Sequence, residues 1–360
     1  MKKWLLGAVA TVAIVASIPT AAFAAEDTAT ADKLAAYYAE DSLNHWATAD
    51  LHDFMQGDIL AGYEKDGVVS VKPNGEITRA EFVAIVLRAA DVKTEASDVK
   101  FTDVKKGDWF YDSVATASAQ GLIFGVGDNR FAPNEKITRA EISAILNRFF
   151  KETIDFTGEA KQFNDIKGHW AQPDIENISK ADIVAGYNNS FKPNDNATRA
   201  EASSMIRRAL HKEVKAAPEE KDLIAVTEGF HKASIDLLAA QKFDELKELT
   251  DAKTTGFAHE MGLFSIDVMK SMLKELAEVS EAKVELNVSG DAAYKVIFAS
   301  DRYAAVEVSG QMMETKVTIE DESKSESSSV DETYLLRKVN GEWTIYGGND
   351  SYKKFVELMT

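Results

Sequence analysis

The tetrapeptide Thr-Arg-Ala-Glu occurs three times in the sequence, and its arginines, Arg79, Arg139 and Arg199, stand sixty residues apart. The surrounding sequences are ITRAEF, ITRAEI and ATRAEA, and an apolar stretch follows each copy. A fixed period of this length is the signature of a repeat architecture, in which each unit is one supersecondary element that needs its neighbours. The chain is therefore expected to fold around three related units.

Each unit has the same order of features. An aromatic residue and an aspartate precede a tryptophan; a helical stretch ending on glycine, a short Pro-Asn turn and the TRAE helix follow. In the first TRAE helix Phe82, Ile85, Val86 and Ala89 recur at i, i+3, i+4 and i+7, the period of an amphipathic helix. One helix–loop–helix pair cannot bury such a stripe alone, so three units are expected to pack around a shared core.

The threonine and glutamate of the tetrapeptide predict a helix start. They stand three residues apart directly before the apolar run, which is the spacing of a capping box. A glutamate in the first turn also complements the positive end of the helix dipole. The residues expected to cap helices in this way are Thr78, Glu81, Thr138, Glu141, Thr198 and Glu201.

The arginine is not explained by helix formation, because the helix dipole disfavours a cation at the first helical position. The arginine could form a surface salt bridge, or it could be present only because the repeat was duplicated with it; these are two structural interpretations. The third is a fork that binds a carboxylate or phosphate, assisted by free amides at the same helix N-terminus. We favour the anion fork at Arg79, Arg139 and Arg199.

The tryptophans and glycines of the units each have a structural and a functional interpretation. Half-buried packing is the default for Trp46, Trp109 and Trp170, whereas a partly exposed ring beside an arginine would provide a stacking surface for a sugar. The glycines near the end of the first helices are first of all turn and C-cap residues. They include Gly62, Gly125 and Gly186.

Together, the tryptophan, the glycine-ended helix, the Pro-Asn turn and TRAE, in tandem over residues 38–214, resemble the S-layer homology (SLH) domain. In that family three repeats form a pseudo-threefold body around a central helix bundle. Grooves between adjacent repeats bind a secondary cell-wall polysaccharide attached to peptidoglycan, usually through a pyruvylated, anionic sugar.

This resemblance implies a ligand-binding role for three sets of residues. The arginines would face the ketal carboxylate, the tryptophans would lie near the groove, and the glycines would lie where the backbone approaches the sugar. The positions are Arg79, Arg139, Arg199, Trp46, Trp109, Trp170, Gly62, Gly125 and Gly186. The first repeat departs from the family pattern, with Tyr38 and Asp41 at its opening and a longer loop, so three equal sites are not expected.

The repeats are bounded at 25–92, 93–154 and 155–214, with a predicted signal peptide at 1–24. Lys2 and Lys3 precede an apolar run that leads into Ala22-Phe23-Ala24, which is typical of cleavage after export. No later segment approaches the ~20 apolar residues that span a bilayer. We therefore expect a secreted protein at the cell wall or cell surface, without membrane attachment after cleavage.

Composition excludes several classes of partner and chemistry. The 41 Lys and Arg residues against 59 Asp and Glu give a net charge of −18, which argues against a protein that binds the phosphate backbone of nucleic acid. Cysteine is absent, so thiol nucleophiles and cysteine metal sites are excluded. No cofactor or metal is expected.

After a solvated linker at 215–222, residues 223–360 have a different pattern. Helical stretches are followed, from Lys283, by alternating strands with a hairpin turn at Asn340-Gly341. This order predicts an α+β domain with an antiparallel curved sheet that resembles the NTF2-like fold. The segment DESKSESSS at 321–329 is expected to be a hairpin tip or a disordered loop.

The C-terminal domain offers little recognisable catalytic chemistry. His259-Glu260 begins like a zinc-protease helix, but Leu263 stands where the second histidine ligand belongs. His231 and His259 are expected to be surface or capping residues, and no catalytic residue is predicted.

The leading hypothesis is a wall-anchored protein whose C-terminal domain is a structural or ligand-binding module. The alternatives are a surface hydrolase of glycan or peptide tethered by the repeats, and self-assembly with neighbours in a surface layer.

Overall fold

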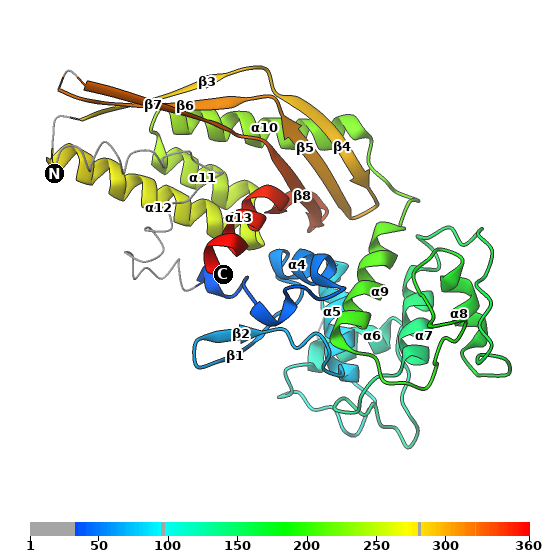
Figure 1. Ribbon diagram of the computed structural model, residues 1–360. Coiled ribbons are helices and arrows are strands. Elements are labelled where there is room, and N and C mark those ends of the chain that lie inside the picture. The colour runs from blue at the N-terminus through cyan, green and yellow to red at the C-terminus, as the bar shows by residue number, and fades with distance from the viewer. Residues whose placement is uncertain (1–32, 95–97, 280–281, 321) are drawn as a thin grey trace.

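The computed structural model describes residues 33–360, apart from 95–97, 280–281 and 321. The predicted signal peptide at 1–24 and the first residues assigned to repeat one lie outside the described residues. The described chain forms a helical N-terminal part and a C-terminal part in which helices lie against a long sheet (Figure 1).

The N-terminal part contains pairs of helices that follow the sixty-residue period. The TRAE helix of one repeat packs on the first helix of the next: α5 on α6, α7 on α8, and α9 back on α4. A repeat therefore buries its apolar face against its neighbour rather than within itself. The bounds are η2 (Glu40–Ser42), α4 (Thr48–Gln56), β1 (Tyr63–Lys65), β2 (Val68–Ser70), α5 (Arg79–Ala89), α6 (Tyr111–Ala119), α7 (Arg139–Phe150), α8 (Gln172–Ser179) and α9 (Arg199–His211).

A closed ring of main-chain hydrogen bonds joins the three repeats directly before their TRAE helices. Ile77 N–H donates to the carbonyl of Ala197 at 3.0 Å, Ala197 to Ile137 at 2.9 Å, and Ile137 to Ile77 at 3.1 Å. All three residues are fully buried. Each repeat thus supplies one donor and one acceptor to the same ring.

The C-terminal part consists of helices followed by antiparallel strands, which confirms the predicted strand-rich α+β region. The sheets have the strand orders β4-β5-β8-β9 and β3-β6-β7. The bounds are α10 (Glu220–Ala239), α11 (Phe243–Lys253), α12 (Gly256–Val279), β3 (Lys283–Ser289), β4 (Ala293–Ala299), β5 (Tyr303–Ser309), β6 (Met312–Ile319), β7 (Glu322–Ser329), β8 (Glu332–Val339), β9 (Glu342–Gly348) and α13 (Asn349–Met359).

The chain passes from one sheet to the other through short bends between β3 and β4, between β5 and β6, and between β7 and β8. Each of these strand pairs therefore forms one long, bent strand that is shared by the two sheets. Gly290 and Gly310 occupy two of these bends with φ of +86° and +96°. A Cβ atom on Gly290 would lie 2.3 Å from the carbonyl oxygen of Gly310. These glycines allow the hairpins to bend over α10 (Figure 1).

One prediction for this region is wrong, and one element was missed. Within the Ser-rich segment 321–329, expected to be a hairpin tip or a disordered loop, residues Glu322–Ser329 instead form strand β7 and pair with β6 along its length. An edge strand needs hydrogen bonds on one side only, and its polar side chains remain in water. The final helix α13 was not anticipated; it buries Tyr352 and Phe355.

The two parts share a contact surface with buried polar bonds. The Tyr346 hydroxyl donates to Asp53, and the main-chain N–H of Gly348 donates to Gln56 Oε1 at 3.1 Å. The Tyr303 hydroxyl donates to the carbonyl of Ala89 at 2.6 Å. The C-terminal domain is therefore packed against the first repeat and is not merely tethered through 215–222.

Candidate functional site

The TRAE helices all begin with the same local hydrogen bonds. In each capping box the threonine Oγ1 accepts the glutamate N–H at 3.2 Å, and the glutamate Oε2 accepts the threonine N–H at 2.8–2.9 Å. The residues are Thr78, Glu81, Thr138, Glu141, Thr198 and Glu201.

Each TRAE arginine reaches into the following repeat, where the N–H groups of its guanidinium donate hydrogen bonds to protein oxygens. Arg139 donates from Nε to the carbonyl of Phe191 at 2.9 Å, and from Nη2 to the carbonyl of Ala185 at 2.9 Å. Its Nη1 donates to Glu201 Oε1 at 2.7 Å. Arg139 is 4% exposed, so it is a buried clamp between repeats two and three.

The same clamp recurs around the ring. Arg79 of repeat one donates to the carbonyls of Phe131 and Phe124 and pairs with Glu141 of repeat two. Arg199 of repeat three donates to the carbonyls of Val71 and Ala61 at 2.8 and 3.0 Å. It lies 3.7 Å from Glu81 of repeat one. The capping glutamates therefore serve twice, starting their own helix and pairing with the arginine of the preceding repeat.

The helix N-termini do not present the free amides expected for an anion. The N–H groups of Arg139 and Ala140 donate to the carbonyls of Asp195 and Pro193, both at 3.0 Å. The corresponding amides of the other two TRAE helices donate to the Pro-Asn turns at 133–135 and 73–75. The capping threonines accept the third amide of each helix, so the first three amides all have partners within the protein. The neighbouring turn takes the place expected for a ligand, and the expectation of exposed amides is wrong.

An aspartate near the start of each repeat fixes the Pro-Asn turn. Asp165 accepts the N–H groups of Phe191 and Lys192 at 2.7 Å. Asp41 and Asp103 accept the equivalent amides of their own repeats. The residue before proline has a positive φ in all three turns: Lys72, Ala132 and Lys192. Asp41 thus replaces the missing Phe-x-Asp aspartate of repeat one.

Sequence reasoning missed a lysine–tyrosine pair that two of the three repeats place beside the clamp. Lys72 Nζ lies 4.2 Å from the centre of the Tyr63 ring, and Lys192 Nζ lies 5.2 Å from that of Tyr187. The rings in turn lie 4.8 Å from Arg199 Cζ and 5.3 Å from Arg139 Cζ. The signal was present in the sequence as KPN after GY in these two repeats. Repeat two has APN after GV.

The tyrosines also join the clamp through their hydroxyl groups. Tyr187 donates to Glu201 Oε1 at 2.7 Å, and Tyr63 donates to Glu81 Oε1 at 2.5 Å. Burial by itself would raise the pKa of Glu201, but the Thr198 N–H, the Tyr187 hydroxyl and the charge of Arg139 bring that pKa below its usual value. The carboxylate of the clamp therefore stays ionised into mildly acidic solution.

The three tryptophans are exposed on the surface rather than half-buried. Trp46, Trp109 and Trp170 are 61%, 66% and 60% exposed. In repeats one and three the preceding histidine bonds the asparagine of the Pro-Asn turn; both bonds, His45 to Asn74 and His169 to Asn194, are 3.1 Å. This places the start of the tryptophan segment at the turn that carries Lys72 or Lys192.

The glycines assigned to ligand contact lie where two stretches of the same loop approach closely. A Cβ atom on Gly125 would lie 2.6 Å from the carbonyl oxygen of Arg130, and one on Gly186 would lie 2.6 Å from that of Ser190. At Gly62 the Cβ would lie 2.3 Å from a methyl group of Val69. The close approach is thus within the protein, and contact with a sugar at these glycines stays a prediction.

The C-terminal histidines have different environments. His259 lies at the surface, where Nε2 bonds Asp251 at 3.0 Å. His231 was expected to be a surface or capping residue, but it is buried between the Tyr334 hydroxyl and Gln311 Oε1, at 3.0 and 2.9 Å. Burial lowers the pKa of His231, so its ring is neutral and closes one wall of a cavity.

Comparison with known families defines the class of two of the N-terminal repeats. The S-layer homology domain matches residues 100–142 and 162–203, which contain the second and third TRAE segments. The chain therefore carries S-layer homology domains in these two segments.

Several surface proteins and enzymes are similar to part of the chain. Amylopullulanase of Thermoanaerobacterium thermosulfurigenes is 41% identical over 178 residues, covering 48% of this chain and 9% of that protein. The Cellulosome-anchoring protein of Acetivibrio thermocellus is 34% identical over 149 residues, covering 39% and 33%. The S-layer protein of Bacillus thuringiensis subsp. finitimus is 27% identical over 213 residues, covering 58% and 25%.

The chain thus spans about a third or less of the length of these relatives. The S-layer homology segments and the surface proteins among the relatives locate the chain at the cell wall or cell surface. Within the described residues, no helix combines the length and apolar character needed to cross a membrane.

Proposed function

We propose that the chain is anchored non-covalently at the cell surface through three S-layer homology repeats that form a pseudo-threefold body. Their grooves bind an anionic, pyruvylated secondary cell-wall polysaccharide. The closed ring of bonds among Ile77, Ile137 and Ala197 supports this assembly, because it gives the first repeat the same contacts as the two matched repeats. The anchoring and surface-layer relatives named above support the same role.

The observation that carries the proposal is the position of an aromatic ring and a lysine beside two of the three buried clamps. Each clamp pairs an arginine with a glutamate and is close to neutral, so the arginine shapes the groove while the net positive charge comes from lysine. Lys72 and Lys192 are exposed beside Tyr63 and Tyr187, and the side chain of Lys192 is 49% exposed. An ammonium beside an aromatic ring suits a sugar that carries a carboxylate.

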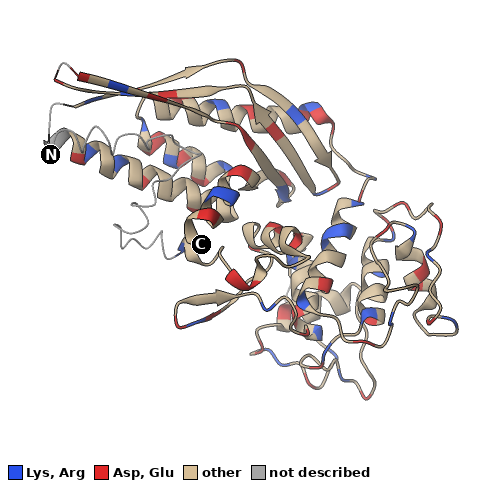
Figure 2. Cartoon of the chain, viewed as in Figure 1, with Lys and Arg blue, Asp and Glu red and all other residues tan. Residues whose placement is uncertain are grey.

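This arrangement ranks the three grooves. Those containing Lys72 and Lys192 provide an exposed cation, whereas the groove of repeat two has Ala132 and Val126 at the equivalent positions. Lys and Arg are otherwise interspersed with Asp and Glu along the described chain (Figure 2). We therefore expect the grooves at repeats one and three to retain the polymer and the groove at repeat two to contribute little.

Retention of the full chain on purified cell wall tests the proposal. Wall that carries pyruvylated polymer should retain the protein, and wall from which the ketal has been removed should not. The double variant Lys72→Ala, Lys192→Ala should lose at least tenfold in affinity, because two local cations are removed while the clamps remain. Lys151→Ala, at the exposed end of α7, is the matched control. Equal retention on both walls would sink the anionic-ligand proposal.

The proposal for the C-terminal domain is a non-catalytic structural or ligand-binding module. One carboxylate, Glu332, is found among the residues lining its cavity in the described chain, whereas glycoside hydrolysis generally uses two. Both ring nitrogens of His231 are occupied by Tyr334 and Gln311, which leaves neither for substrate. These contacts favour a binding module over the tethered hydrolase.

A further inference from the structure

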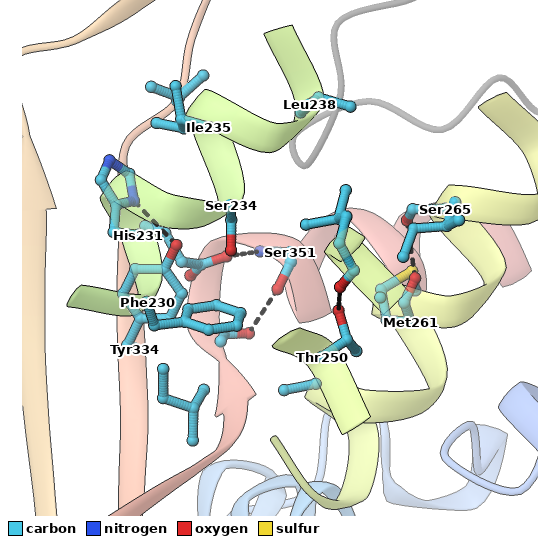
Figure 3. A pocket seen from close by; sticks show the side chains of 18 of the residues that line it. Phe230, His231, Ser234, Ile235, Leu238, Thr250, Met261, Ser265, Tyr334 and Ser351 are labelled. Atoms are coloured by element: carbon cyan, nitrogen blue, oxygen red, sulfur yellow. Dashed lines mark hydrogen bonds between the residues drawn. The ribbon is translucent and has the colours of Figure 1, made fainter. Parts of the chain in front are cut away.

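The C-terminal domain contains a partly open cavity between helices α10–α13 and the sheet (Figure 3). Its volume is about 120 Å³, counted as the space open to the centre of a water molecule. That space corresponds to roughly ten water-sized positions, enough for a small organic molecule. Most of the wall is apolar, and it includes Phe230, Ile235, Leu238, Met261, Met313 and Ile345.

One end of the cavity carries a buried carboxylate. Glu332, the first residue of β8, is 3% exposed. Its Oε1 accepts the N–H groups of Thr333 and Asp350, and its Oε2 accepts that of Ser351, each at 2.9 Å. The carboxylate therefore caps α13, but main-chain amides carry no net charge that would neutralise it.

No lysine or arginine is among the described residues that line this cavity, so the charge of Glu332 has no cationic partner there. Burial of an unpaired carboxylate is costly, and a cation in the cavity would reduce that cost. The tail of the protein thus contains an apolar chamber with a single negative pole.

Two serines add hydrogen-bonding groups near this pole. The buried Oγ of Ser234 on α10 has no hydrogen-bond partner in the described part of the chain. Ser351 on α13 makes a long bond, 3.3 Å, from its Oγ to the carbonyl of Gly348, and its hydroxyl also interacts with the carboxylate of Glu332. In Figure 3 the hydroxyl of Ser234 points toward the end of the cavity where Ser351 lies. An unpartnered buried hydroxyl is uncommon in folded proteins and indicates a place for a ligand or water.

We propose that this cavity binds a small organic amine, with its ammonium at Glu332, Ser234 and Ser351 and its apolar body against the remaining wall. An ammonium has three N–H donors, which matches one carboxylate and two hydroxyl acceptors. The inference rests on the ligand-binding alternative for the C-terminal domain and is independent of wall anchoring.

Calorimetry on the full chain at pH 8 with hexylammonium, 1-hexanol and hexanoate tests the charge preference. Hexylammonium should bind at least tenfold more tightly than hexanol, and hexanoate should not bind. Glu332→Gln should remove the preference for the amine. Equal affinity for amine and alcohol in the native protein, or tighter binding of hexanoate, would overturn the proposal.

A second variant guards against loss of the α13 cap in Glu332→Gln. Ser234→Leu fills the cavity from α10 without altering Glu332, and it should abolish binding of both the amine and the alcohol. Ala240→Leu, exposed at the end of the same helix, should bind like the native protein. Unchanged amine binding in Ser234→Leu would place the ligand elsewhere and refute the site.

The pH dependence provides another readout. Burial raises the pKa of Glu332 to about 7, and the other titratable groups facing it are Asp350 on α13, Tyr334 on β8 and His231 on α10. Because the ionised carboxylate binds the amine, amine affinity should fall about tenfold from pH 8 to pH 6 while hexanol affinity stays constant. A constant amine affinity would contradict the assignment of Glu332.

Wall retention of Ser234→Leu should match the native protein, so failure of the cavity proposal and failure of the anchoring proposal give different results.

Discussion

Replacing Arg139 with alanine should destabilise the protein strongly, although the tetrapeptide looks like an exposed signal. The side chain is 4% exposed and donates to two carbonyls and to Glu201 across the boundary between repeats two and three. Its removal leaves those acceptors without their charged donor in a buried site.

The magnitude follows from these contacts. Removing one partner of a buried ion pair costs about 3–5 kcal/mol. Glu201 keeps its bonds from Thr198 and Tyr187, which favours the lower end of the range, whereas the carbonyls of Phe191 and Ala185 lose their donor, which raises the cost again. We expect Arg139→Ala to lower the free energy of unfolding by about 3–5 kcal/mol and Arg139→Lys by about 2 kcal/mol, since one ammonium cannot reach all three acceptors.

Urea denaturation of the full chain, followed by far-ultraviolet circular dichroism, measures this change. Arg130→Ala removes an exposed arginine from repeat two and should cost less than about 0.5 kcal/mol. A loss below about 1 kcal/mol in Arg139→Ala, combined with lost wall retention, would refute the clamp and restore the free anion fork.

The remaining predictions concern pH, a loop and a turn. Burial lowers the pKa of His52 and, together with the charge of Arg207, that of His211 to about 4. The resulting stability is present above pH 6.5 and lost as the pH falls toward 4, whereas the raised pKa of Glu332 has the opposite effect over the same range. Urea denaturation should therefore show a net loss of about 1–2 kcal/mol in the free energy of unfolding between pH 7.5 and 5, and an unchanged free energy would contradict it. Gly186→Ala should cost about 1–3 kcal/mol by thermal unfolding, because its Cβ would meet Ser190, whereas Gly107→Ala, with open space around it, should be neutral. Asp165→Ala should lower the free energy of unfolding by about 2 kcal/mol, because the turn that carries Lys192 loses two hydrogen bonds. The same variant should bind the cell wall more weakly; urea denaturation and wall retention measure the two effects.

Local interactions explain which parts of the fold the sequence could predict. The capping partners Thr138 and Glu141 stand three residues apart, and the apolar periodicity of the TRAE helices lies within a few turns. Antiparallel strands and the Asn340-Gly341 turn have similarly local patterns, and both turn residues have positive φ. Such features do not depend on where the rest of the chain lies.

The role of the arginine depends on a partner in another repeat. Arg79 pairs with Glu141 and Arg139 with Glu201, each sixty-two residues away. No pattern within one tetrapeptide reveals that pairing. Because the three repeats form a closed ring, the arginine of each tetrapeptide pairs with the glutamate of the next copy, so the same motif supplies both the cation and its acceptor. Strand β7 and the buried His231 were missed for a similar reason, since pairing and burial there are set by distant strands and helices.

In two of the three repeats, the groups proposed to bind the ligand also stabilise the clamp. The Tyr187 hydroxyl bonds the clamp carboxylate of Glu201 while Lys192 lies over its ring. Changing the tyrosine or the arginine would therefore disturb the fold and the groove together, and lost binding would not identify a contact. Among the described residues, the exposed ammonium of Lys192 makes no bond to the clamp; it forms an ion pair with Asp195, at 3.8 Å. Substitution of the lysines consequently separates recognition from assembly, with the alanine already present at position 132 as the natural comparison.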